Sequence, residues 1–134
     1  MPHRTIQPPG WPRPRGYANG MAGRGELLAV AGQIGWDERE VIVSTDFAAQ
    51  LRQALKNVVA VVEAAGGVAS DIISLTLYVT DKREYVAAIQ EVGAAYREQI
   101  GRHYPAMALV EVAGLLEPGA KVEIQALAVL TPPG

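Results

Sequence analysis

The chain has 134 residues, of which 49% are hydrophobic and 19% are charged, and this is the size and composition of one globular domain. It has no cysteine, which excludes disulfides, thiolate catalysis and cysteine-ligated metals. The formal net charge of −2 gives no electrostatic reason to expect nucleic acid, and no apolar run reaches membrane-spanning length. We therefore expect a cytoplasmic protein with neither nucleic acid nor a membrane as its partner.

Residues 1–16 are expected to form a proline-rich arm, and residues 17–134 a single domain. Proline fixes φ and lacks an N–H donor, so the arm cannot be a helix or a central strand. The pattern predicts an extended leader. The alternative is that Trp11 and the arginines of the arm reach a neighbouring subunit or a ligand.

The first half of the domain is predicted to hold a hairpin and a helix. Tyr17–Ala22 and Glu26–Ile34 are strand-like and are joined by glycine-rich residues 23–25, which suits a hairpin. Ser44 or Thr45 is expected to cap the following helix, which ends before two glycines. Its apolar residues recur at spacings of three and four on one face: Phe47, Leu51, Leu55, Val58 and Val62.

The second half is predicted to hold a strand, a helix and two closing strands. Ile72–Thr80 alternates like a strand, and Asp81 and Glu84 have the spacing of a capping box that opens a helix through about Ile100. Residues 105–112 and 122–129 then form the closing strands. The order β-β-α-β-α-β-β predicts an α+β domain with two helices packed on one face of a mostly antiparallel sheet.

The last strand indicates that the other face of the sheet is also covered. Val122, Ile124 and Ala126 alternate with Leu127 and Val129, so both faces carry apolar side chains. A sheet with one solvated face should instead alternate apolar and polar residues. Self-association is the expected solution, although this argument does not give the number of subunits.

An ordered set of motifs resembles the Rid family (reactive intermediate deaminases, YjgF-type, also called endoribonuclease L-PSP). The motifs are Gly16-Tyr17, residues 31–34, residues 63–67, residues 105–112 and residues 122–129. The resemblance implies a chorismate-mutase-like fold, a homotrimer and ligand clefts between adjacent subunits. It also implies hydrolysis of enamines or imines derived from amino acids, with no cofactor.

The resemblance places six residues in the cleft: Tyr17, Gly32, Gly93, Met107, Leu109 and Gln125. Enzymes of the family carry arginine where this chain has Met107, usually glutamate where it has Gln125, and often asparagine where it has Gly93. Such an arginine fixes the substrate carboxylate, and such a glutamate positions or activates water. Met107 cannot hold a carboxylate and Gln125 cannot exchange a proton at neutral pH. Ordinary 2-imino acid deamination is therefore not expected.

Several of these residues also have structural interpretations. Met107 either packs against apolar neighbours or selects an uncharged or aromatic ligand. Gln125, a candidate catalytic residue, either contacts a ligand or satisfies a polar neighbour. The second catalytic candidate, His103, is either a general base or a surface or interface histidine. It is the single histidine outside the arm, and no acidic cluster has ligand spacing, so no metal is expected.

Two functional hypotheses remain. The first is a Rid-like protein that binds a small organic metabolite in an intersubunit cleft, as an imine or enamine deaminase (a hydrolase) with an altered substrate. The second is a protein that binds or senses a small ligand without catalysis. A ribonuclease is not favoured, because the sequence has neither a basic patch nor a pair of histidines for acid–base cleavage.

Overall fold

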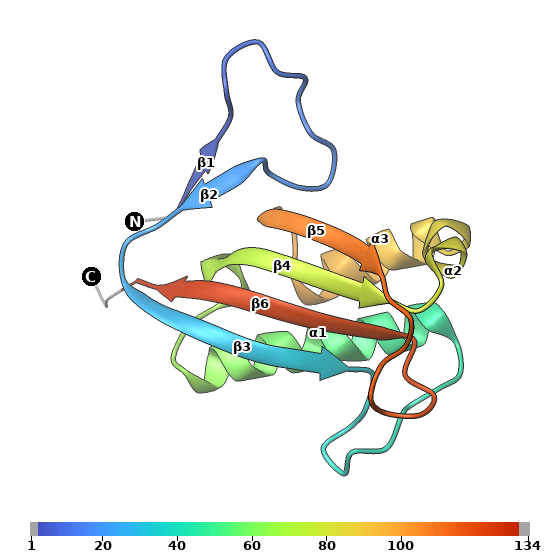
Figure 1. Cartoon of the computed structure of the whole chain (residues 1–134). Coiled ribbons are helices and arrows are strands. Elements are labelled where there is room, and N and C mark those ends of the chain that lie inside the picture. The colour runs from blue at the N-terminus through green and yellow to red at the C-terminus, as the bar shows by residue number, and fades with distance from the viewer. Residues whose placement is uncertain (1–2, 132–134) are drawn as a thin grey trace.

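A four-stranded sheet with helices on one face forms the body of the protein (Figure 1). The computed structural model describes residues 3–131. Its elements are β1 (Arg4–Ile6), β2 (Gly20–Ala22), β3 (Glu26–Ile34), α1 (Phe47–Ala64), the 3₁₀ turn η1 (Ala69–Asp71), β4 (Ile72–Val79), α2 (Lys82–Ala87), α3 (Ile89–Gln99), β5 (Ala106–Glu111) and β6 (Val122–Leu130). No helix of these residues is long and apolar enough to cross a bilayer.

The sheet has the strand order β3-β6-β4-β5. The central strand β6 runs antiparallel to both β3 and β4, whereas β5 pairs in parallel with β4 at the edge. Parallel strands require a crossover, and helices α2 and α3 supply it here. The predicted α+β class with a mostly antiparallel sheet is confirmed.

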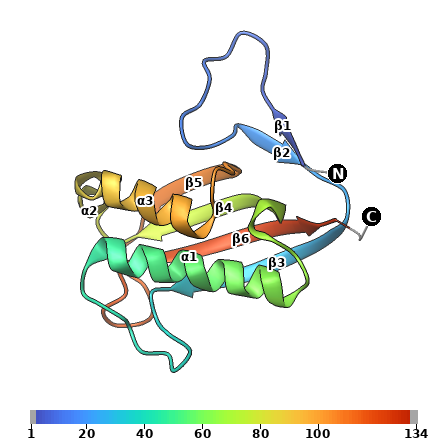
Figure 2. The same cartoon turned by 180° about the vertical axis from the view of Figure 1, so that it is seen from behind.

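The hydrophobic core lies between the sheet and the helices, which Figure 2 shows in front of the sheet. Alternate residues of β6 point into this core, and Val122, Ile124 and Ala128 have no exposed surface. They pack against the apolar face of α1, where Leu51 and Leu55 are buried. The core-facing residues of β6 recur at every second position and those of α1 at every third or fourth position. Both periodicities are therefore visible in the sequence.

Figure 1 looks onto the opposite face of the sheet, which no helix of residues 3–131 covers. Apolar side chains are exposed on this face: Leu27 is 65% exposed, Val110 42% and Leu127 38%. We call this surface the open face. Its apolar content agrees with the two-sided pattern of the sequence.

The predicted hairpin between residues 17 and 34 is wrong. β2 pairs with β1, in the register Arg4↔Ala22 to Ile6↔Gly20, and not with β3. The connecting glycines bring the chain close to the end of β6, since a Cβ on Gly25 would overlap the carbonyl oxygen of Leu130. A close backbone approach of this kind replaces the tight turn that the composition predicted.

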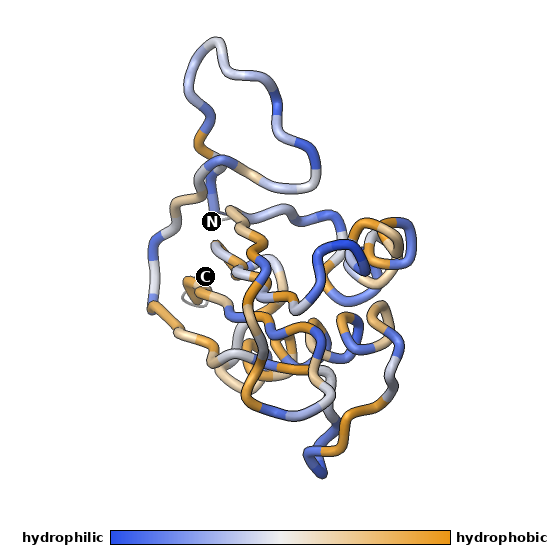
Figure 3. Tube along the Cα trace, turned by 45° about the vertical axis from the view of Figure 1, so that its right-hand side comes forward, coloured by the Kyte–Doolittle hydropathy of each residue, from blue (hydrophilic) through white to orange (hydrophobic). Residues whose placement is uncertain are grey.

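The loop between β1 and β2 extends away from the sheet, and Figure 3 shows it as mostly hydrophilic. Its base is attached to the body of the protein through His3, whose side chain is 2% exposed. The Nε2 atom of His3 lies 2.8 Å from the carbonyl oxygen of Val129. The arm thus contributes a short edge strand, which its proline pattern permits.

Two helix boundaries also differ from the predictions. The N-cap of α1 is Asp46, whose carboxylate accepts from Ala49 N at 3.0 Å, and not Ser44 or Thr45. The single helix predicted from Asp81 to Ile100 is divided at Ala88, where φ is −101° and ψ is 21°. Apolar spacing continues across this break, so the sequence pattern alone does not reveal it.

Candidate functional site

A cavity of about 670 Å³ lies between the edge strand β5, the helices and the segment Arg15–Tyr17. Leucines of α1 and β4 line it together with the helix-facing residues of β5. The parallel register Leu75↔Met107 and Leu77↔Leu109 gives the β5 side chains this direction. Met107 and Leu109 are therefore part of the apolar wall of the cavity.

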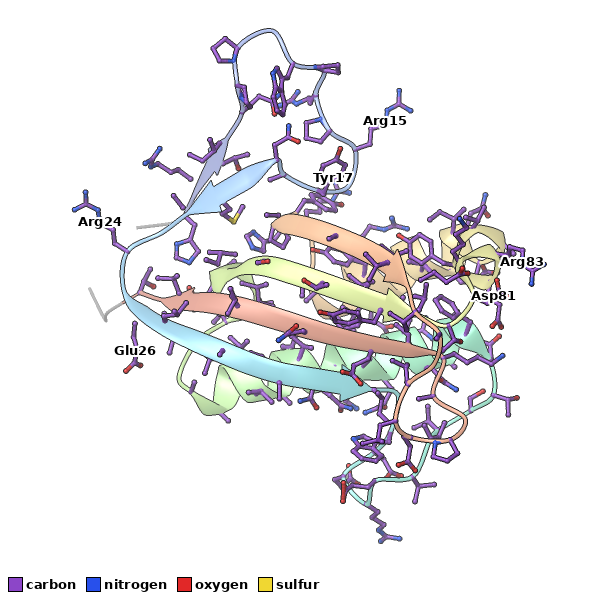
Figure 4. All side chains as sticks on the ribbon, in the orientation of Figure 1. Arg15, Tyr17, Arg24, Glu26, Asp81 and Arg83 are labelled. Carbon is purple, nitrogen blue, oxygen red and sulfur yellow. The ribbon has the colours of Figure 1, made fainter. Side chains whose placement is uncertain are left out.

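Tyr17 reaches the cavity because the chain around it is attached to the start of β5. Ala18 N donates to the carbonyl oxygen of Pro105 at 3.0 Å, and Ala18 forms a parallel bridge with Ala106. Figure 4 shows Tyr17 between the N-terminal loop and β5. The predicted residues Tyr17, Met107 and Leu109 thus line one cavity.

Tyrosines form another part of the lining. Tyr96 and Tyr104 are stacked, with ring centroids 5.6 Å apart and planes inclined by 11°. The Tyr96 hydroxyl donates to the carbonyl oxygen of His103 at 2.5 Å. Burial raises the pKa of Tyr96, with a further contribution from Tyr104, and burial alone raises the pKa of Tyr85. Tyr85 and Tyr96 are therefore neutral near pH 7 and cannot act as bases. Tyr85 can serve as a hydrogen-bond donor, whereas the one O–H of Tyr96 is already donated to His103.

Two arginines also line the cavity. Arg15 belongs to the arm, for which contact with a ligand was the alternative expectation, and Arg97 was not expected in the site from the sequence. Arg97 lies one helical turn after Gly93 on α3, and its guanidinium lies over this glycine: a Cβ at position 93 would be 3.3 Å from Nη1. The lining contains no aspartate, glutamate or histidine among the described residues. The spacing of four residues on a predicted helix was the available signal for Arg97.

Gly32 and Gln125 lie elsewhere, on the open face. Gln125 pairs with Thr76 across the sheet, and its Oε1 accepts from the Tyr78 hydroxyl at 3.1 Å. A Cβ on Gly32 would overlap the carboxylate of Glu123, so the glycine lets this carboxylate lie against β3. Within one chain, the sheet separates the side chains of Gln125, Tyr78 and Glu123 from the cavity.

His103 is also outside the cavity. Its Nε2 donates to the carbonyl oxygen of Ile72 at 2.6 Å, and it lines a second cavity, of about 610 Å³, that includes His3, Asp71 and Arg102. A carbonyl can only accept, so this bond places the hydrogen of neutral His103 on Nε2. Within residues 3–131, no group of three or more histidine, aspartate or glutamate side chains is arranged to hold a metal ion.

Comparison with known proteins identifies the class of this fold and then the family. The fold is chorismate-mutase-like and is shared with a Rid-family protein of unknown function, YyfB of Yersinia pestis, at a TM-score of 0.83 and 29% identity over 97% of this chain and all of that one. The Escherichia coli YjgF gene product matches with a TM-score of 0.66 and 36% identity, over 94% of this chain and 98% of that one.

Sequence comparison agrees with the structural comparison. A 2-iminobutanoate/2-iminopropanoate deaminase of Salmonella typhimurium is 38% identical over 105 residues, which are 78% of this chain and 80% of the relative. The family model described as Endoribonuclease L-PSP matches residues 12–130. The chain belongs to this family, the Rid/YjgF family.

Proposed function

We propose that the protein is an imine or enamine deaminase with an altered substrate, and that its active site forms between two copies of the chain. The relatives named as 2-iminobutanoate/2-iminopropanoate deaminases support the reaction class. The observation that carries the proposal is the division of the family-matched residues between two faces of one sheet. Met107 and Leu109 line the cavity, whereas Gly32 and Gln125 lie on the open face.

A second copy would join the two groups of residues. The exposed Leu27, Val110 and Leu127 give the open face an apolar surface suited to association. If this face covers the cavity of a neighbouring subunit, Gln125 of one chain lies opposite Met107 of the next. We propose a closed homotrimer as the assembly, following the family resemblance.

The reaction adds water to the carbon of a C=N bond, and the resulting carbinolamine releases ammonia and leaves a carbonyl group. Gln125 contributes by orientation, because its Oε1 is held by Tyr78 and its NH₂ group is available to donate to the water. The proton of the water is passed to the leaving nitrogen. Glu123, on the same face beside Gly32, is an acidic group that can relay it.

The altered substrate follows from the lining of the cavity. Leucine, methionine and tyrosine side chains surround a volume of about 670 Å³, which is within the usual range for small-ligand sites. An imine with a large apolar body would bury more of its surface here than 2-iminopropanoate does, and each buried CH₂ contributes about 0.8 kcal/mol.

One observation favours ligand binding without turnover as a second candidate. The described lining of the cavity has no carboxylate or imidazole that could exchange a proton near pH 7. A binding or sensing protein would need only the apolar walls and the hydrogen-bond donors of this cavity.

Ammonia release would test the proposal. An amino acid oxidase can generate imines from alanine and from phenylalanine in the assay, with hydrolysis in the absence of the protein as the reference. We expect the wild type to accelerate ammonia release from the phenylalanine-derived imine more than from the alanine-derived one. The variant Met107→Arg/Gln125→Glu should shift this preference toward the smaller imine. Saturable binding of the phenylalanine-derived product with no acceleration would contradict turnover and support the second candidate.

A further inference from the structure

The guanidinium of Arg97 is the charged group that α3 contributes to the lining of the cavity. Residues three and four positions away on a helix are adjacent on its surface. For Arg97 these positions hold Gly93, Ala94, Ile100 and Gly101, none of which is acidic. The charge of Arg97 therefore has no partner on its own helix.

Three of the twelve lysine and arginine side chains, those of Arg52, Arg83 and Lys121, are paired with a carboxylate at short distance. Arg52 Nε lies 2.6 Å from Glu98, and Lys121 Nζ lies 2.8 Å from Glu84. No carboxylate within residues 3–131 lies within ion-pair distance of Arg97. An arginine that lines a cavity without a carboxylate partner is free to bind an anion there.

The guanidinium of Arg97 packs closely over Gly93. A Cβ at position 93 would be 3.3 Å from Nη1 of Arg97 and 4.0 Å from both Cζ and Nη2, so the planar group lies directly over the glycine. Glycine in the interior of a helix is unfavourable, and a packing reason is expected where it occurs. Here the absence of a side chain lets the guanidinium remain close to the helix and beside the cavity.

We propose that Arg97 is the group that binds the acid of the ligand in this cavity, and that the ligand is a small carboxylate with an apolar body. This inference deepens the proposed function and rests on it, since it names the substrate class of the same site. A planar guanidinium can bind a carboxylate through two parallel hydrogen bonds. The apolar body would then lie against Met107 and Leu109 of β5.

The position of Arg15 explains why Arg97 and not Arg15 is assigned this role. Figure 4 shows the side chain of Arg15 pointing away from the sheet, at the end of the N-terminal loop. Arg97 instead extends from α3, and its exposed side chain lines the cavity together with Val92 and Tyr96. The acid would therefore be held at α3 and not at β5.

Binding of a matched pair of probes would test this assignment. Phenylacetate and phenylacetamide have nearly the same shape and differ in charge, and calorimetry can measure the Kd of each. We expect the wild type to bind the acid at least about tenfold more tightly than the amide, which corresponds to one charge-assisted hydrogen bond. Arg97→Gln should remove this preference and leave the Kd of the amide unchanged. Arg97→Lys should restore part of it.

Arg24→Gln is the matched control, because Arg24 lies on the other side of the molecule from Arg15 and Tyr17 (Figure 4). This variant should keep the full preference. Equal Kd values for the two probes, no binding of either probe, or a preference that survives Arg97→Gln would overturn the inference. The ammonia assay is independent of this result: a preference lost in Arg97→Gln without any wild-type turnover would refute the deaminase and retain the assignment of Arg97.

Discussion

Replacing Gly93 by alanine should change stability and ligand binding in opposite directions. Gly93 lies within α3, where alanine is favoured over glycine by about 1 kcal/mol. The new methyl group would be 3.3 Å from Arg97 Nη1, and the end of a flexible side chain can move by the few tenths of an ångström that this contact requires. The helix is therefore expected to gain stability while the guanidinium is displaced.

The magnitudes of both effects can be estimated. For a chain of 134 residues, a gain of about 1 kcal/mol raises Tm by about 3–4 °C. Displacement of the guanidinium that removes half of a charge-assisted hydrogen bond of roughly 1.5 kcal/mol weakens binding of phenylacetate about threefold. The Kd of phenylacetamide should not change.

Thermal unfolding followed by circular dichroism gives the first quantity, and calorimetry gives the second. Ala94→Gly is the control: Ala94 is exposed on the same helix and does not line the cavity, so this variant should lose about 1 kcal/mol and keep its affinity. A Gly93→Ala variant that is more stable but binds phenylacetate as tightly as the wild type would refute the role of the glycine in positioning Arg97. A Gly93→Ala variant with a lower Tm than the wild type would refute the expectation that the Arg97 side chain can move away from the new methyl group at little cost.

Two further perturbations test the fold and the assembly. Gln50 is fully buried, donates to the carbonyl oxygens of Ser44 and Gly119 at 2.9 Å each, and accepts from Lys121 N at 2.8 Å. Gln50→Leu leaves these three backbone groups unpaired and should lower the free energy of unfolding, measured by urea titration, by about 3 kcal/mol or more. A loss below about 1 kcal/mol would show that the three hydrogen bonds do not contribute as expected. Leu127→Glu places a carboxylate on the open face and should reduce the mass measured by light scattering to that of one chain, whereas an unchanged mass would rule this face out as the interface.

The elements of the sheet and of the core could be predicted because their periodicity is direct. β4 and β6 alternate, and α1 repeats its apolar residues every three or four positions. The pairing of β1 with β2 could not be predicted in the same way. Arg4–Ile6 is a three-residue segment between prolines, and such a segment carries no measurable alternation.

The candidate site could be predicted in composition but not in arrangement. Met107 and Gln125 are assigned by resemblance to one cleft, yet their faces depend on register: Met107 pairs with Leu75 and Gln125 with Thr76. Adjacent residues of β4 point to opposite faces, so these two pairings place the side chains on opposite sides of the sheet. Only the observed register shows that one chain divides the site.

Three features of this chain have a common explanation if the cation of the site is supplied by the helix. By the family resemblance, Met107 stands at a position on β5 where an arginine is expected. Gly93 lowers the stability of α3, and Arg97 lies beside the cavity without a carboxylate partner. Considered separately, the first is the expected absence of a carboxylate-binding group, the second is a cost in stability and the third is an unpaired charge. Together they describe the transfer of one guanidinium from the strand to the opposite wall. With the guanidinium on α3, the acid of the ligand would be held at the helix side of the cavity and not at β5. The reacting C=N bond would then take a different position relative to Gln125 of the neighbouring subunit.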